Sequence, residues 1–267
     1  MQTVDNKTDA DFRGQWLIRP VVLFIGLIAV WQLVTIITQA PVYILPGPIK
    51  VLETLTGNLG LIMSHATVTA LEIVLGLFIG TLLGIASALC LTYFRPARRW
   101  LLPVLVVSQS LPVFALAPVL VLWFGYGLAS KVAMAVLIIY FPVAAACYDG
   151  LRHTNAGWLD LARTMNASKL AILRQIRFPA ALPALASGLR VAAAVAPIGA
   201  VVGEWVGSSR GLGYLMLHAN GRMQIDLMFA ALFVLALLAI VIYFSINWWL
   251  GRLLSWQPET LSFTDQE

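Results

Sequence analysis

Ionisable side chains that can bind a partner gather in one segment, residues 158–183 (WLDLARTMNASKLAILRQIRFPAALP). Asn166 is a residue type that tolerates the left-handed backbone that ends a helix, and Ser168 can cap a following helix. The sequence therefore predicts two short helices joined at Asn166, the second of which ends at Pro179. The segment is basic, with the acid Asp160 against Arg163, Lys169, Arg174 and Arg177. Such a hairpin is either a docking surface for a soluble partner or an ordinary basic loop.

Two acids, Glu72 and Glu204, lie at or within long apolar stretches. An ionisable group inside a membrane is costly and is more often paired or functional than idle. We expect each of these acids to pair with Arg210 or Arg222 or to contact a partner protein. For Glu72, a hydrogen bond within the helix bundle is the alternative.

The sequence contains no complete catalytic or metal-binding pattern. It has no G-x-x-x-x-G-K-[ST] loop, so the chain cannot hold nucleotide phosphates by itself. Cys90 and Cys147 are isolated within apolar runs, which indicates neither a disulfide framework nor a metal site. The histidines are scattered along the chain, at His65, His153 and His218. We therefore expect no enzyme activity, no catalytic, metal or cofactor-binding residue, and no cofactor.

The composition is that of a membrane protein. Of the 267 residues, 60% are hydrophobic and 11% are charged, and the mean hydropathy is +0.88. These charges are too few to cover a soluble domain of this length. The net charge of +5 is no argument for nucleic-acid binding, because membrane proteins concentrate Lys and Arg on their cytoplasmic side.

Charge-free stretches predict an all-α protein with six transmembrane helices, because a bilayer core needs about 20 apolar residues per helix. The fifth helix starts near Ser187 and must carry Arg190, Glu204 or both at or inside its margins. Three prolines in the third stretch predict a bent or broken helix. The other five stretches are 20–39, 69–94, 101–124, 132–148 and 227–250.

Six spans place both termini on the same side of the membrane. If the N-terminus is inside, 13 of the 17 Lys and Arg residues lie inside, which is a clear positive-inside signal. Both termini and the 158–183 segment are therefore expected in the cytoplasm. The predicted organisation is a cytoplasmic tail at 1–19, a transmembrane domain at 20–256 with a cytoplasmic loop at about 150–185, and a second tail at 257–267.

The 158–183 segment resembles the EAA loop of binding-protein-dependent ABC importer permeases, whose pattern is EAA, three residues, Gly, nine residues, then I-x-L-P. Asp160, Leu161 and Ala162 occupy the EAA positions, and Asn166 occupies the glycine. The I-x-L-P positions hold Ile176, Phe178 and Pro179. Asp stands for Glu, Leu for the first Ala, Asn for Gly and Phe for Leu. The position between the fourth and fifth predicted spans, on the positive side, supports the match.

Three further stretches resemble permeases of the taurine, alkanesulfonate and nitrate group: ILPGP at 44–48, SLPVFALAPVLVLWFGYGLASK at 110–131 and GEWVGSSRGLGYLM at 203–216. The second of them and LMLHANGRMQIDLMFAAL at 215–232 look most like permeases for pyrimidine precursors of thiamine. The resemblance implies the type I ABC importer permease fold and import of a hydroxymethylpyrimidine-type precursor. Import of taurine, alkanesulfonate or nitrate is the alternative.

The resemblance also implies partners and a location. Two copies of the chain would form a homodimer in the inner membrane of a bacterium, as a multi-pass protein in the lipid bilayer. A separate cytoplasmic ATPase subunit would bind and hydrolyse ATP, and an extracytoplasmic solute-binding protein would deliver the substrate. No nucleic acid is expected as a partner.

The same resemblance implies roles for individual residues. The ATPase-coupling residues would be Asp160, Ala162, Arg163, Met165, Asn166, Ser168, Lys169, Leu170 and Arg174. Some of the apolar members have the alternative of packing on the protein itself. The pathway-lining candidates are Ala194, Pro197, Gly199, Glu204 and Trp123. For these the alternative is helix packing, because Ala and Gly let helices approach closely, or, for Trp123, an interfacial aromatic.

Two other classes of protein remain as alternatives. An ion-coupled secondary transporter would use Glu72 and Glu204, but such proteins usually show two related halves, and no repeat joins residues 1–133 and 134–267. An intramembrane enzyme would need a catalytic pair that the spacing of the residues does not supply.

Overall fold

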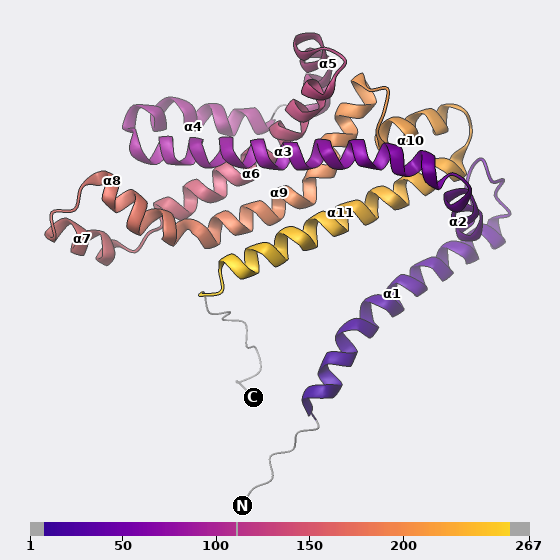
Figure 1. The fold of residues 1–267 in the computed structure, drawn as a ribbon, viewed down its shortest axis with the longest axis horizontal. Helices are drawn as coiled ribbons and strands as arrows, with labels where there is room; N and C mark the ends of the chain where they lie inside the picture. The colour runs from indigo at the N-terminus through magenta and orange to yellow at the C-terminus, as the bar shows by residue number, and fades with distance from the viewer. Residues whose placement is uncertain (1–7, 111, 257–267) are drawn as a thin grey trace, which may run out of the picture.

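The computed structural model describes residues 8–110 and 112–256, and this part of the chain consists of helices and the turns between them. Figure 1 shows a bundle of long helices with short helices at both ends. In chain order the helices are α1 Thr8–Thr38, α2 Pro48–Gly57, α3 Leu59–Tyr93, α4 Arg95–Ser110, α5 Val113–Phe124, α6 Leu128–Arg152, α7 Ala156–Thr164, α8 Lys169–Ile172, the π-helical turn η1 Leu173–Arg177, α9 Phe178–Gly207, α10 Leu212–Gly221 and α11 Ile225–Leu253.

The centre of the bundle is formed by α3, α6 and α9, which pack at very short distance through small residues. Gly76, Gly80 and Gly84 recur every four residues on α3 and therefore share one face of that helix. A Cβ atom at Gly80 would lie 2.8 Å from Cγ2 of Ile139 on α6. Side chains larger than hydrogen would thus push the two helices apart. This is the packing that glycine permits between membrane helices.

The contact between α6 and α9 is equally close. A Cβ atom at Gly188 would lie 2.7 Å from the carbonyl oxygen of Pro142, and one at Gly199 would lie 2.8 Å from Cα of Ala135. Backbone atoms cannot move aside as the end of a flexible side chain can. The small residues of α9 therefore hold its position on α6.

In the described part of the chain, four helices are long and apolar enough to cross a membrane: α3, α6, the continuous stretch Lys169–Gly207 and α11. Two shorter apolar helices, Val22–Thr38 and Val113–Phe124, coincide with the first predicted span and the second half of the third. The count of six spans and the side on which the termini lie remain predictions. In Figure 1, α1 runs away from the bundle, and Trp31 near its end contacts Phe229 of α11 with ring centroids 5.6 Å apart.

The expected break in the third span is confirmed, because α4 ends at Ser110 and α5 begins at Val113. Pro112 precedes α5 in an extended conformation, with φ −62° and ψ 117°. The other two prolines, Pro103 and Pro118, lie inside α4 and α5 and do not end them.

The predicted end of the second hairpin helix at Pro179 is wrong. The chain passes from α8 through η1 into α9 without leaving the helical conformation. Phe178 N–H donates to the carbonyl of Leu173, five residues back, which is the bond of a π turn. Pro179 follows in the first turn of α9, where a missing N–H costs little.

The fifth membrane helix consequently begins well before Ser187 and carries charged residues within it, as expected. The guanidinium Nε of Arg190 donates to Oδ1 of Asn247 at 2.8 Å and so ties α9 to α11. The second span is also longer than predicted, since α3 begins at Leu59.

Cysteine labelling tests the predicted orientation. In Figure 1, α2 and α8 lie at opposite ends of the bundle, so Lys50→Cys and Lys169→Cys report on opposite faces. In a Cys90→Ala, Cys147→Ala background, a membrane-impermeant maleimide should label Lys50→Cys in intact cells. It should label Lys169→Cys only in inside-out vesicles. The reverse pattern would contradict the orientation.

Candidate functional site

The α7–α8 hairpin, residues 156–172, has the local structure that its sequence predicts. Asn166 adopts a left-handed conformation with φ 54°. The hydroxyl of Ser168 accepts a hydrogen bond from Ala171 N–H at 3.2 Å and caps α8. At the other end, Oδ1 of Asn155 accepts from Gly157 N–H at 2.8 Å and caps α7. The two helices and the turn at Asn166 are therefore confirmed.

One face of the hairpin is apolar and exposed. Trp158, Leu161 and Met165 follow at spacings of three and four residues, which places them on the same side of α7. Their exposed fractions are 56%, 62% and 74%. They line an apolar hollow of about 510 Å³ together with Pro183 and Trp256. A helix this short is not stable by itself, and an apolar face on it is usually covered by other protein atoms. The exposed face of α7 is therefore suited to contact with a partner protein.

The expected coupling residues divide between the surface and the interior. Ala162 is 5% exposed and lies on the inner side of α7, so it packs on the protein itself. The other expected coupling residues are exposed: Asp160, Arg163, Met165, Asn166, Ser168, Lys169, Leu170 and, in η1, Arg174. Asp160 and Arg163 form an ion pair at 2.8 Å, which contributes little at this exposure. Coupling to an ATPase stays a prediction for all of them.

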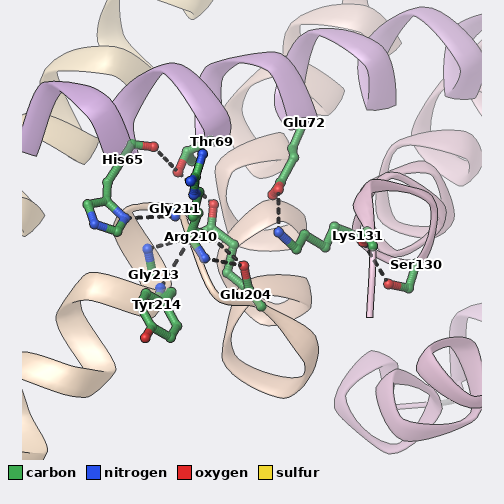
Figure 2. A network of polar contacts seen from close by, with 12 residues as sticks. His65, Thr69, Glu72, Ser130, Lys131, Glu204, Arg210, Gly211, Gly213 and Tyr214 are labelled. Carbon is green, nitrogen blue, oxygen red and sulfur yellow. Dashed lines mark hydrogen bonds and ion pairs between the residues drawn. The ribbon is translucent and has the colours of Figure 1, made fainter. Parts of the chain in front are cut away.

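A buried ion pair lies between α3 and α6, where Nζ of Lys131 is 3.0 Å from Oε1 of Glu72. Figure 2 shows the two side chains reaching toward each other from separate helices. Glu72 is fully buried and Lys131 is 6% exposed. Removing one partner of such a buried pair typically costs about 3–5 kcal/mol, because it leaves the other charge uncompensated. Glu72 thus forms an ion pair, as expected, but its partner is Lys131 and neither Arg210 nor Arg222.

The second acid, Glu204, binds the start of α10 (Figure 2). Its carboxylate accepts from the backbone N–H groups of Gly213 and Tyr214, the latter at 3.3 Å. It also accepts from the hydroxyl of Thr69 on α3 at 2.6 Å. Thr69 Oγ1 in turn accepts from Leu212 N–H at 2.8 Å. The first N–H groups of a helix have no acceptor within that helix. Here the side chains of Thr69 on α3 and Glu204 on α9 provide the acceptors.

The loop before α10 is held by the same region of α3. Gly211 N–H donates to Nδ1 of His65 at 3.0 Å, and the rings of His65 and Tyr214 stack with centroids 6.0 Å apart. Gly211 has φ 117°, which only glycine adopts readily. A Cβ atom there would also collide with the Glu204 carboxylate. We name the contacts of Glu204, Thr69, His65 and the 211–214 backbone the α10 clasp.

The pairing expected for Glu204 with Arg210 or Arg222 is not found among the ion pairs of the described residues, because backbone amides take up the carboxylate oxygens. Sequence reasoning missed Lys131 as the partner of Glu72. A lone cation at the start of an apolar run was the signal that could have found it, since a buried charge needs a counter-charge.

The pathway-lining candidates differ in their exposure. Ala194 and Trp123 are exposed, the latter by 71%. Pro197, Gly199 and Glu204 are buried, and the contact of Gly199 with α6 accounts for its lack of a side chain. That these residues line a pathway stays a prediction.

The comparison with known proteins identifies the class of this chain. The family described as binding-protein-dependent transport system inner membrane component matches residues 80–255. A probable ABC transporter permease protein of Haemophilus influenzae is 58% identical over 236 residues, covering 88% of this chain and 96% of that protein. The chain belongs to this family and is the permease component of an ABC importer, a multi-pass membrane protein.

Other relatives carry more specific names. The formylaminopyrimidine transport permease ThiX of Halalkalibacterium halodurans is 37% identical, covering 92% of this chain and 99% of that protein. The riboflavin transport system permease RibX of Chloroflexus aurantiacus is 36% identical, covering 84% of each. Among solved structures, an inward-facing MetNI methionine ABC transporter matches with TM-score 0.64 and 19% identity, covering 73% of this chain and 97% of that one. The last match shows that the fold is shared.

Asn166 provides a test of the hairpin turn. Asn166→Gly should change the free energy of unfolding by less than about 0.5 kcal/mol, because glycine adopts the same conformation. Asn166→Val should lower it by about 1–3 kcal/mol, because a β-branched residue is strained at positive φ. Thermal unfolding in detergent measures both. Equal stability of the two variants would contradict the role of Asn166.

Glu204→Ala tests the α10 clasp. It would leave the N–H groups of Gly213 and Tyr214 without their acceptor, so the free energy of unfolding should fall by about 2 kcal/mol or more. Glu204→Gln keeps an amide oxygen as acceptor and should lose less. The control is Glu53→Ala, because Glu53 is exposed and its pair with Lys50 is on the surface. If Glu204→Ala unfolds at the same temperature as Glu53→Ala, the clasp contributes nothing.

Proposed function

We propose that two copies of this chain form the membrane pathway of an importer in the bacterial inner membrane, driven by a separate ATPase through the α7–α8 hairpin. The observation that carries the proposal is the exposed apolar face of Trp158, Leu161 and Met165. The same segment also exposes the cations Lys169 and Arg174. An exposed apolar patch accompanied by charged residues is typical of a protein interface.

Motion of the hairpin can reach the membrane helices because the chain is continuously helical from Lys169 to Gly207. A push on α8 is therefore transmitted along α9 without an intervening loop. α9 packs on α6 through backbone contacts at Gly188 and Gly199, so both helices would move together. We infer that ATP-driven displacement of the hairpin changes which side of the membrane the pathway faces.

The proposed substrate is a hydroxymethylpyrimidine-type precursor of thiamine. The 37% identity to a permease named for formylaminopyrimidine, over nearly its full length, supports this choice. RibX, named for riboflavin, is almost as similar, and it too is named for a nitrogen heterocycle. Taurine, alkanesulfonate or nitrate is the alternative, and the taurine permease TauC of Escherichia coli is 29% identical.

An ion-coupled mechanism has less support in the structure. It would need Glu72 or Glu204 to release and rebind a cation during transport. Glu72 faces Lys131 at 3.0 Å, and Glu204 is bound to the backbone of α10. Both acids already have partners that stabilise the bundle.

Met165→Lys tests the coupling. The Met165 side chain is 74% exposed, so the variant should fold normally. A lysine at the centre of an apolar interface should cost about 2 kcal/mol or more, equivalent to a roughly 30-fold weaker association with the ATPase subunit. ATP-dependent uptake into vesicles should fall accordingly. The measurement is made with the complete importer and its solute-binding protein.

Met223→Lys is the matched control, because Met223 is 62% exposed and lies in the turn between α10 and α11. It should leave the association with the ATPase unchanged. Normal uptake by Met165→Lys would contradict the proposal that the α7–α8 hairpin couples the permease to the ATPase. In the same assay, uptake of the pyrimidine but not of taurine by the wild type supports the proposed substrate, and the opposite result selects the alternative.

A further inference from the structure

A basic cavity lies beside the α7–α8 hairpin, at the end of α3. Its volume is about 560 Å³. In Figure 1 the last turn of α3, the start of α4 and the α7–α8 hairpin lie together at one end of the bundle. The cavity is lined by Thr92, Tyr93, Arg98, Leu159, Arg163, Ala167, Lys169, Ile172, Leu173 and Arg177. Side chains from four separate parts of the chain thus converge on one space.

The lining carries four cations and, within the described residues, no carboxylate. The cations are Arg98, Arg163, Lys169 and Arg177. Only Arg163 has an acidic neighbour, Asp160, on the surface. A smaller hollow of about 400 Å³ shares Arg98 and adds Arg99 and Arg152. Like charges held this close repel one another, and an anion between them relieves the repulsion.

Arg177, one of the lining cations, offers a hydrogen-bond donor for such an anion. Its Nε is buried and has no hydrogen-bond partner in the described part of the chain. A buried donor without an acceptor is costly, the more so on a charged group. The planar guanidinium matches a phosphate group, to which it donates two parallel hydrogen bonds.

The position of the cavity favours a lipid as the source of the phosphate. Tyr93, which lines the cavity, ends the apolar α3, and Phe94 follows it. Both are exposed, as is Trp100 of α4. Exposed aromatic side chains at the end of a membrane helix mark the level of the lipid headgroups. Basic pockets between membrane helices at the cytoplasmic face bind anionic headgroups. This is the face that the positive-inside count assigns to the cytoplasm.

We propose that the cavity between α3, α4 and the α7–α8 hairpin binds the phosphate of an anionic phospholipid headgroup through Arg98 and Arg177. The bound lipid would join the hairpin to the membrane surface, because Arg177 ends η1, which follows α8, and Arg98 belongs to α4. Trp158, Leu161 and Met165 do not line this cavity, whereas Arg163 and Lys169 do.

Native mass spectrometry of the purified full-length chain tests the proposal. Delipidated protein is titrated with phosphatidylglycerol or with phosphatidylcholine of the same acyl chains. The wild type should prefer phosphatidylglycerol. The double variant Arg98→Gln, Arg177→Gln should lose roughly 25-fold in apparent affinity for it, about 5-fold for each cation removed. Arg98→Lys keeps the charge and should retain most of the preference, which separates binding from misfolding.

Arg252→Gln is the control, because Arg252 stacks on Trp248 with Cζ 3.9 Å from the ring centroid and lies on α11, outside the cavity. A double variant that binds phosphatidylglycerol as well as this control does would overturn the proposal. So would equal binding of the two lipids by the wild type. Inorganic phosphate is the second probe: saturable binding that phosphatidylglycerol does not displace would identify a soluble phosphate as the ligand instead. Loss of binding to the ATPase with lipid binding intact would assign the cations to that protein.

Discussion

The backbone amides at the start of α10 set the constraint on which this structure depends. An N–H group buried in the protein cannot reach water, so it needs a partner from the protein itself. Leu212, Gly213 and Tyr214 find theirs in Thr69 of α3 and Glu204 of α9. One short helix therefore holds two long ones in register. The Glu72–Lys131 pair ties α6 to α3 within the same region.

The second constraint is steric. The glycines of α3 and α9 that face α6 allow the backbones of these helices to reach van der Waals contact with α6. A side chain at these positions would collide with α6. Association of helices in lipid has little hydrophobic driving force, so it depends on this close contact and on polar bonds. The core of the bundle is thus built from small residues and three buried charges.

The two ends of the bundle differ in chemistry. One end has the α10 clasp, where acids meet backbone amides. The other has the α7–α8 hairpin and the basic cavity, where cations outnumber acids. The helical chain continues from the hairpin to Gly207, and Glu204 lies in the last turn of α9, so one continuous stretch joins the two ends. The coupling proposed above uses this continuity.

Much of this could be read from the sequence, because it depends on local chemistry. The apolar stretches located the four long apolar helices, and the Asn166 turn and the Ser168 cap followed from backbone preference. The three prolines of the third stretch predicted a bend or break there, and the structure shows it at Pro112. The π turn before Pro179 could not be read, because its hydrogen bond depends on how α9 docks. Lys131 and Glu72 are far apart in the chain, and their pairing requires α3 and α6 to lie side by side. The partners of Glu204 were likewise decided by tertiary structure, since a carboxylate in an apolar helix accepts whichever donors the fold brings within reach.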